Sequence, residues 1–439
     1  MLKRKTALHP RDLYLERLIA FQDTEPVKVI TGIRRCGKSS LMKLMAQHLR
    51  KSGVTDEQIL EMNFESMDFR KMTAEELYQY VKQRLPESKR AYLFFDEIQR
   101  IDQWQDAVNS FRVDFDCDIY VTGSNAFLLS SEYATYLAGR SVEIKMLPLS
   151  FKEFLDFHGY TIKESRHPAS GLRKRIYDAD GESYEPRELL DAYLRFGGMP
   201  GIADVGLDMD KALTLLDGVY STVVVRDILE RERRRGQRQI TDPDLLRKII
   251  MFLADNIGNS TSITSISNTL VNEKLLAPER KGNPSAHTVQ SYVSALLESY
   301  VFYEIKRFDI KGKEYLRTMG KYYIVDIGLR NYLLGFRDVD TGHILENIVY
   351  FELLRRGYDV AIGKVGNKEV DFIATSAEEK RYIQVTESMN EPATRERELA
   401  PLRMIPDNYE KLVIAANCDN PVTHDGIKIV RLTDFLLES

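Results

Sequence analysis

The stretch Val27–Ser39, VKVITGIRRCGKS, is a short apolar segment that runs directly into the spacing Gly-x4-Gly-Lys-Ser. Glycines let a backbone wrap closely around phosphate groups, so that successive N–H groups point at the bound oxygens. A lysine adds positive charge at the outer phosphates, and a serine offers its hydroxyl to Mg²⁺. The apolar spacing of Ser39–Leu49 predicts a helix that begins at this loop. The sequence therefore predicts a P-loop that binds a nucleoside triphosphate, with ATP and Mg²⁺ as the expected cofactors.

The residues of this loop that we expect to hold the nucleotide are Gly32, Ile33, Arg34, Arg35, Cys36, Gly37, Lys38, Ser39 and Ser40. Lys38 is also a candidate catalytic residue, because its charge acts on the outer phosphates, and Ser39 is a candidate Mg²⁺ ligand. Cys36 has two interpretations. A thiol inside such a loop could be sensitive to oxidation, or it is a small side chain that the loop tolerates.

The composition is that of a soluble globular protein with more than one domain. With 439 residues the chain is long enough for two to four domains, and its net charge of −4 does not by itself indicate nucleic-acid binding. No apolar run approaches the roughly 20 residues that span a bilayer, so no membrane association is expected. Three cysteines without metal-ligand spacing and an N-terminus without an apolar signal core predict a cytoplasmic location.

Strands and helices alternate from residue 27 to about residue 148, which predicts a three-layer α/β domain with a parallel sheet. The expected helices besides Ser39–Leu49 are Ala74–Arg84 and Gln103–Phe111. The expected strands are Val27–Thr31, Ile59–Phe64, Ala91–Phe95, Asp118–Thr122 and Val142–Met146. Beyond residue 151 the chain is predicted to be mostly helical, with a polar loop around Ser165–Pro186.

The segment Tyr92–Gln99, YLFFDEIQ, has an apolar strand that ends in two carboxylates. Such a strand delivers Asp96 beside the P-loop, where it can hold Mg²⁺ directly or through water. Glu97 then lies where a general base could orient and deprotonate the attacking water. An acidic turn after a buried strand is the alternative, but the P-loop upstream favours the catalytic interpretation.

The segment Ile119–Asn125, IYVTGSN, is a second apolar strand that ends in small polar residues. Asn125, and less strongly Ser124, is a candidate sensor that hydrogen-bonds the γ-phosphate or the attacking water. The alternative is an ordinary Gly-Ser-Asn turn.

The motifs GIRRCGKSS, FFDEIQ, VTGSN, LAGR and LPLSFKEF, in this order, resemble the prokaryotic AAA+ family that carries an uncharacterised C-terminal domain. The resemblance implies an ATPase core with Walker A and Walker B motifs. It also implies an arginine finger at Arg140, usually acting on the nucleotide of a neighbouring subunit, which would require a homo-oligomer. A structural Arg that pairs with a nearby carboxylate is the alternative. The loop Gly197–Gly201 is similar to the Gly-x-Pro element in the lid of signalling ATPases, which implies that Pro200 lies near the adenine. A helix C-cap followed by a proline also explains this loop, and both can hold at once.

We expect four domains: an ATPase core over residues 1–150, a helical lid and linker over 151–238, a winged helix over 239–338 and a small nuclease-like α/β domain over 339–439. The winged helix is predicted from helices at Leu245–Ile257, Ser262–Val271 and Ser285–Tyr300 with strands at Val301–Phe308 and Lys321–Val325. Its third helix would contact duplex DNA, or the domain would serve protein contacts or act as a rigid connector.

The last region resembles the core of restriction-type nucleases, in which two carboxylates and a lysine support metal-assisted attack on a phosphodiester. Glu346 and Asp371 fit the carboxylate positions. Gln384 and Thr386 stand where that pattern has an acid and a lysine, so the motif is degenerate and a fold retained for binding or assembly is favoured over cleavage.

The sequence as a whole predicts an ATP-hydrolysing AAA+-type switch, bound to ATP or ADP, that moves its C-terminal domains through a hinge at residues 231–238. A DNA-binding regulator and an ATP-dependent nuclease are the alternatives. The expected partners are a protein, duplex DNA or further copies of the chain.

Overall fold

The computed structural model describes residues 8–86, 89–123, 139–167, 171–222, 228–229, 240–272, 284–312, 314–315, 319–337, 341–418 and 423–438. Two compact units make up the chain, residues 1–147 with 298–300 and residues 148–297 with 301–439. The sensor candidates Ser124 and Asn125 and the hinge at 231–238 lie outside the described residues. No described helix combines the length and the apolar character needed to cross a membrane.

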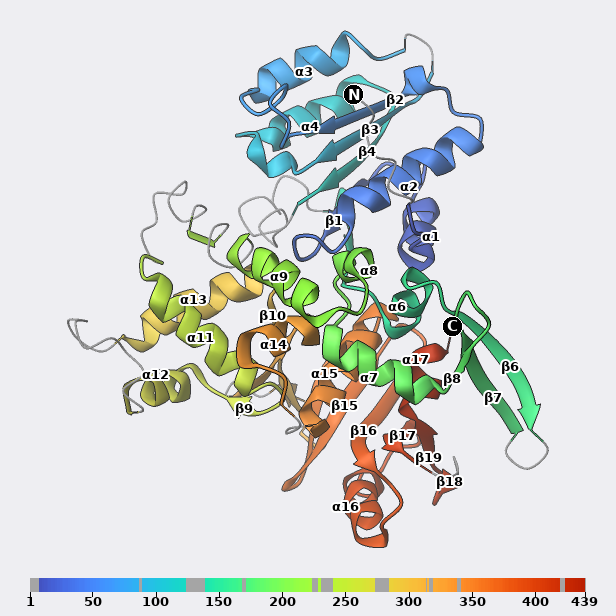
Figure 1. Cartoon of the computed structure of the whole chain (residues 1–439). Coiled ribbons are helices and arrows are strands. Elements are labelled where there is room, and N and C mark those ends of the chain that lie inside the picture. The colour runs from blue at the N-terminus through green and yellow to red at the C-terminus, as the bar shows by residue number, and fades with distance from the viewer. Residues whose placement is uncertain are drawn as a thin grey trace. The chain divides into compact units, whose positions relative to one another are not determined.

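The first unit is built on a five-stranded parallel sheet, which confirms the α/β fold expected from the sequence (Figure 1). The strand order is β2-β3-β4-β1-β5, so β1 with its loop lies between β4 and β5. The strands are β1 (Val27–Thr31), β2 (Ile59–Asn63), β3 (Ala91–Asp96), β4 (Cys117–Thr122) and β5 (Ser141–Lys145).

Helices cover both faces of this sheet. The helices α3 (Ala74–Lys82) and α4 (Trp104–Asp114) pack on one face, over a core that includes Val29, Phe95 and Val121. The helices α1 (Asp12–Ala20) and α2 (Lys38–Lys51) pack against each other and contact β5 and β4 respectively (Figure 1). Short 3-10 turns, η1 (Asp56–Gln58) and η2 (Ile98–Arg100), precede β2 and follow β3.

A buried ion pair lies within this sheet, between Lys28 on β1 and Asp118 on β4. The Lys28 ammonium donates a short hydrogen bond to Asp118 and a second one to the Thr24 carbonyl at 2.9 Å. The Asp118 carboxylate also accepts from the Asp23 N–H at 2.9 Å and the Tyr120 hydroxyl at 2.8 Å. Burial lowers the pKa of Lys28, and the hydrogen bond to Asp118 opposes that shift. The two charges therefore depend on each other.

The second unit begins with α6 (Phe151–Phe157), whose first turn is capped by Ser150. A three-stranded antiparallel sheet of β6 (Thr161–His167), β7 (Gly171–Tyr177) and β8 (Ser183–Tyr184) follows. The polar loop predicted around Ser165–Pro186 is therefore wrong. This hairpin carries few apolar residues, so its strands lack the alternation that marks a half-buried strand in a sequence. The helices α7 (Pro186–Phe196), α8 (Gly201–Val205) and α9 (Met209–Tyr220) come next.

The middle of the second unit has the helices α11 (Pro243–Asp255), α12 (Ile263–Asn272) and α13 (Ala286–Glu298). A three-stranded antiparallel sheet accompanies them, in the order β10 (Phe302–Ile305), β13 (Gly320–Ile324) and β9 (Ser260–Thr261). The predicted strand Val301–Phe308 is wrong, because it divides at Lys306. Beyond that residue, β11 (Arg307–Asp309) pairs with β14 (Asp359–Val365) in a different sheet.

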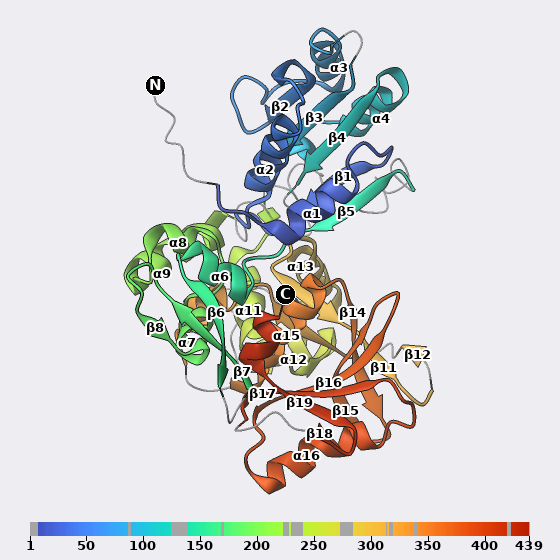
Figure 2. The same ribbon diagram turned by 90° about the vertical axis from the view of Figure 1, so that its right-hand side faces the viewer.

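The C-terminal part holds an eight-stranded mixed sheet in the order β12-β11-β14-β15-β16-β17-β19-β18. The helix α15 (Thr341–Arg355) packs on β14, β15 and β16, and α16 (Pro392–Arg403) packs on β15, β16 and β17 (Figure 2). The remaining elements are β12 (Glu314–Tyr315), α14 (Ile327–Leu334), β15 (Lys368–Thr375), β16 (Lys380–Ser388), β17 (Glu410–Asn417), β18 (Thr423–His424), β19 (Ile427–Arg431) and α17 (Leu432–Leu437).

Candidate nucleotide-binding site

The loop between β1 and α2 has the backbone geometry that its glycines permit. Gly32 has φ +137° and Gly37 has φ +106°, conformations that other residues rarely adopt. A Cβ atom on Gly32 would lie 2.1 Å from the carbonyl oxygen of Met146, which is a steric clash. The loop therefore requires glycine at position 32 both for its conformation and for its close approach to the chain after β5.

Lys38 is the first residue of α2 and is almost entirely buried. Its ammonium donates to the carbonyls of Gly32 at 2.9 Å and Ile33 at 3.1 Å, so the loop curls around its own lysine. Ser39 and Ser40 follow in the first turn, where the N–H groups of a helix have no carbonyl partner within the helix. Unpaired N–H groups and a buried cation at one helix end are suited to phosphate.

The other side chains of the loop differ in what they can offer a nucleotide. Ile33 and Cys36 are fully buried, so only their backbone groups can face a ligand. Burial of the Cys36 thiol favours the simpler of its two interpretations, a small packed residue. Arg35 is exposed, and the Arg34 guanidinium lies 2.8 Å from a carboxylate oxygen of Glu65.

Arg11 contacts the P-loop through its side chain. The sequence analysis did not identify this residue. Its guanidinium is buried and donates to the carbonyls of Cys36 at 3.1 Å and Leu147 at 2.9 Å. Both contacts join segments far apart in the chain, so no local pattern could have indicated them.

Asp96 ends β3 at the same edge of the sheet as the P-loop, with β4 between them. One of its carboxylate oxygens accepts from the Thr122 hydroxyl at 2.6 Å, and the other accepts from the Asn63 side-chain amide at 2.9 Å. Asn63 and Thr122 end β2 and β4, so three neighbouring strands fix this carboxylate. The positions of Asn63 and Thr122 at strand ends could have indicated their contact with Asp96, but the sequence analysis did not use them.

Glu97 follows Asp96 in a left-handed conformation with φ +57°, which is uncommon for a residue other than glycine. Its N–H donates to the same Thr122 hydroxyl at 2.9 Å. Its carboxylate accepts from the Gln99 side chain at 2.5 Å. The Thr122 hydroxyl is thus hydrogen-bonded to the Asp96 carboxylate and to the backbone of Glu97. The left-handed backbone of Glu97 is strained, and strained residues are common at functional sites.

Arg140 lies at the opposite edge of the sheet from the P-loop of its own chain. Its carbonyl accepts from the N–H of Val27, at the amino end of β1, whereas the P-loop follows the carboxyl end of that strand. The five residues of β1 separate the two by about 16 Å. The exposed Arg140 side chain is therefore not brought to the P-loop of the same chain.

The loop with Pro200 has well-defined partners inside the second unit. The N–H of Gly198 donates to the Asp326 carboxylate at 2.6 Å, and the other Asp326 oxygen caps α14 by accepting from the Leu329 N–H at 2.9 Å. A Cβ atom on Gly197 would lie 2.4 Å from that carboxylate. These contacts give the glycines a structural role, and a role of Pro200 at the nucleotide stays a prediction.

Burial raises the pKa of Asp326 to about 6, although backbone hydrogen bonds from Gly198, Leu329 and Gly328 oppose the shift. The folded state therefore holds this proton over a range in which an unfolded aspartate, with a pKa near 4, has lost it. We expect the free energy of unfolding of wild type, relative to Asp326→Asn, to fall by up to about 3 kcal/mol between pH 4 and pH 7. Urea unfolding followed by circular dichroism at several pH values measures this difference, and a constant or rising difference would contradict it.

Two family models match the chain. Residues 24–155 match a family described as an AAA domain, and residues 187–340 match a domain of unknown function (DUF8612). An uncharacterized protein of Haemophilus influenzae is 39% identical over 98% of this chain and 99% of its own length. The chain belongs to the same family. An uncharacterized protein of Methanocaldococcus jannaschii is 31% identical over 93% of this chain and 82% of its own length.

The AAA domain contains the P-loop and both carboxylates, which confirms the coarser part of the resemblance, an AAA-type ATPase domain. Among solved structures, a Walker-type ATPase of Pyrococcus abyssi is 16% identical, with a TM-score of 0.46 over 74% of this chain and 95% of that one. DnaA of Aquifex aeolicus, bound to AMPPCP, is 13% identical, with a TM-score of 0.28 over 65% of this chain and 86% of that one. Scores below 0.5 indicate only a loose likeness.

Proposed function

We propose that this chain is a Mg²⁺-dependent ATPase that works as a nucleotide switch. One observation supports this most strongly: Thr122 holds Asp96 and Glu97 together at the edge of the sheet where the P-loop begins. Phosphate binding alone does not require a second carboxylate, Glu97, held in a strained conformation beside Asp96. The AAA domain over residues 24–155 supports the same conclusion.

The proposed roles follow from the chemistry of each group. The Lys38 ammonium and the N–H groups of the loop hold the outer phosphates, while the Ser39 hydroxyl and the Asp96 carboxylate are oxygen donors of the kind that Mg²⁺ prefers. Mg²⁺ would neutralise charge on the β- and γ-phosphates. Glu97 orients the attacking water and takes its proton as the bond from the γ-phosphorus to the bridging oxygen breaks, releasing ADP and phosphate. Asn125 stays a candidate sensor.

We propose further that the nucleotide state changes the C-terminal half, with residues 151–238 as lid and linker, 239–338 as a winged helix and 339–439 as a nuclease-like domain. The helices α11–α13 with the antiparallel sheet of β9, β10 and β13 support the second of these. At the start of α13, the Ser285 hydroxyl accepts from the Thr288 N–H at 3.1 Å. That contact is a helix cap, so it does not itself favour DNA over a protein partner.

Lys38→Ala should abolish ATP binding, because Lys38 is the buried cation of the P-loop, whereas Arg35 is exposed and Arg34 is paired with Glu65. We expect a loss of affinity of at least about a hundredfold, as for a buried charge that contacts phosphate. Titration with a fluorescent ATP analogue measures it. Lys43→Ala, on an exposed position of the same helix, is the matched control and should bind as wild type does. Equal affinities of wild type and Lys38→Ala would contradict the proposal.

If Arg140 acts on the nucleotide of a neighbouring copy, two inactive variants should restore each other. Lys38→Ala lacks the site and Arg140→Ala lacks the finger, so a mixed oligomer contains some complete sites. We expect mixed samples to hydrolyse ATP at up to about a quarter of the wild-type rate, by random pairing, while each variant alone stays near background. Phosphate release at equal total protein measures this, and no gain on mixing would favour a structural role for Arg140.

A further inference from the structure

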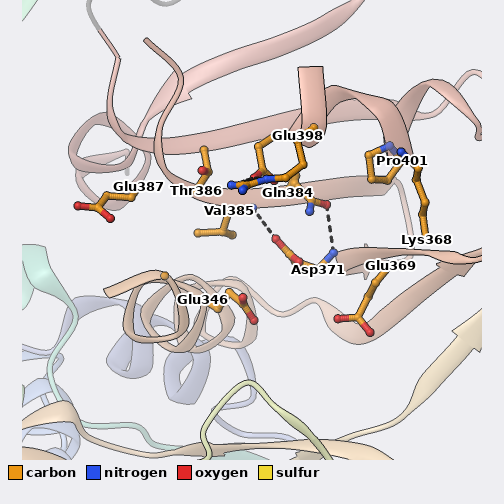
Figure 3. A pocket seen from close by; sticks show the side chains of 12 residues that line it. Glu346, Lys368, Glu369, Asp371, Gln384, Val385, Thr386, Glu387, Glu398 and Pro401 are labelled. Carbon is orange, nitrogen blue, oxygen red and sulfur yellow. Dashed lines mark hydrogen bonds and ion pairs between the residues drawn. The ribbon is translucent and has the colours of Figure 1, made fainter. Parts of the chain in front are cut away.

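A pocket of about 560 Å³ lies in the second unit, between α15, α16 and the strands β15 and β16 (Figure 3). Its inner wall consists of five polar residues, each with less than a tenth of its surface exposed: Glu346, Asp371, Gln384, Thr386 and Glu398. The four residues of the nuclease-like pattern thus do lie together. Burial of so many polar groups costs free energy unless they have partners.

Several of these groups have hydrogen-bonding capacity that the chain does not use. The side-chain hydroxyl of Thr386 makes no hydrogen bond within the described part of the chain, although only 6% of this residue is exposed. Gln384 accepts from the N–H of Asp371 at 3.3 Å, which leaves its amide donors open. One oxygen of Asp371 accepts from the N–H of Val385 at 2.8 Å (Figure 3). The other oxygen accepts no hydrogen bond from the described residues.

The charge balance of the pocket excludes an anion as its occupant. Five carboxylates line it, including Glu369 and Glu387 nearer its rim, against the two basic side chains of Lys368 and Arg397. Lys321, from β13, adds one ammonium, which lies 3.1 Å from Glu346 and 2.8 Å from Glu369. Burial and then the charge of Glu346 raise the pKa of Asp371 well above its usual range. The Arg397 guanidinium donates to one oxygen of Glu398 at 2.8 and 3.0 Å and leaves the other oxygen open. Apart from Asp371, four carboxylates therefore face three cations, and the pocket keeps a negative excess.

A nuclease-like fold implies a divalent metal at this place, and the residues present do not fit one. Among the described residues, no group of three or more His, Cys, Asp or Glu side chains is arranged to hold a metal ion. Gln384 supplies no charge, and the Lys321 ammonium already lies between two of the carboxylates. The pocket is, in addition, several times larger than the space that one metal ion with its waters requires.

We propose that this pocket binds an organic cation, a primary ammonium or guanidinium group, between Asp371 and Glu398 with Thr386 and Gln384 as neutral partners. Lys321 gives the precedent, because the same wall already accepts an ammonium from the chain. Such a group would donate to the Asp371 oxygen that Val385 leaves open, the second oxygen of Glu398 and the Thr386 hydroxyl. Its positive charge favours the ionised form of Asp371, so binding releases the Asp371 proton to solvent. The group could belong to a small diamine or to a Lys or Arg side chain of another protein.

Calorimetric titration of the full chain with agmatine, cadaverine and the tripeptide Gly-Arg-Gly tests this proposal. We expect saturable binding of at least one of them, at one site per chain. Asp371→Asn should weaken it at least about tenfold and Thr386→Val about fivefold. Glu378→Gln, an exposed carboxylate outside the pocket, should leave it unchanged. Tighter binding of the tripeptide identifies a protein side chain as the source, and tighter binding of the amines identifies a small molecule.

Three results would overturn the proposal. The first is that none of the three cations saturates, and the second is that binding is the same in wild type and Thr386→Val. Thr386→Val keeps the shape and charge of the pocket, so it decides the question even if Asp371→Asn fails to fold. The third is a stoichiometric Mn²⁺ site in wild type that Asp371→Asn or Thr386→Val removes, since this would make the pocket a metal site.

Discussion

Glu97→Gln should lower the rate of ATP hydrolysis by a factor of about a hundred or more while ATP still binds. The glutamine keeps the size and the hydrogen bond to Gln99, but it cannot accept the proton of the attacking water. Lys38 and the loop N–H groups, which hold the phosphates, are unchanged. The Glu97 N–H still donates to Thr122, so the strained turn after β3 is retained. Single-turnover hydrolysis separates this chemical defect from slow product release.

Glu57→Gln is the control for this variant, because Glu57 is an exposed carboxylate in η1 of the same unit. It should hydrolyse ATP as wild type does. If wild type and Glu97→Gln hydrolyse ATP at the same rate, Glu97 is not the general base. If Glu97→Gln also fails to bind ATP, its effect is structural.

Lys28→Met should lower the free energy of unfolding of the first unit by about 3–5 kcal/mol. Methionine fills the volume of the lysine stem but leaves the Asp118 carboxylate buried without a cation, on donors from Asp23 and Tyr120 alone. Trp104 is the single tryptophan of the chain and packs in the core of this unit, so its fluorescence during urea unfolding reports on the unit itself. A loss below about 1 kcal/mol would show that the pair is not coupled as described.

The double variant Lys28→Met with Asp118→Asn is the control. Removing the second charge takes away the unpaired carboxylate, so part of the lost free energy should return. A double variant less stable than Lys28→Met alone would contradict this account of the pair.

The strands β1 and β3 of the first unit were predictable because they are buried along their whole length. The largely apolar runs at Val27–Thr31, interrupted by Lys28, and at Ala91–Phe95 mark these two strands within a residue. The P-loop and the two acids follow strand ends at positions that local sequence reveals. Arg11 was not predictable, since its contacts to Cys36 and Leu147 depend on the folded chain.

The second unit was harder to predict for physical reasons. The strands β6 and β7 are rich in charged residues, and the break at Lys306 falls inside one continuous apolar and charged run. The pocket was foreseen only in part. Glu346, Asp371, Gln384 and Thr386 could be grouped from a pattern, but Lys321 reaches the carboxylates from a strand of another sheet. Sequence alone could not show that an ammonium lies there.

The measurement that tests the central claim most directly is phosphate release from ATP by the purified wild-type chain, with Mg²⁺ and with excess chelator, beside Asp96→Asn. Asp96 accepts from Thr122 and Asn63, so asparagine there removes the charge that the proposed Mg²⁺ site requires. The account predicts turnover that depends on Mg²⁺ and falls at least about a hundredfold in Asp96→Asn. Turnover that is equal with and without Mg²⁺, or equal in the two proteins, would contradict it.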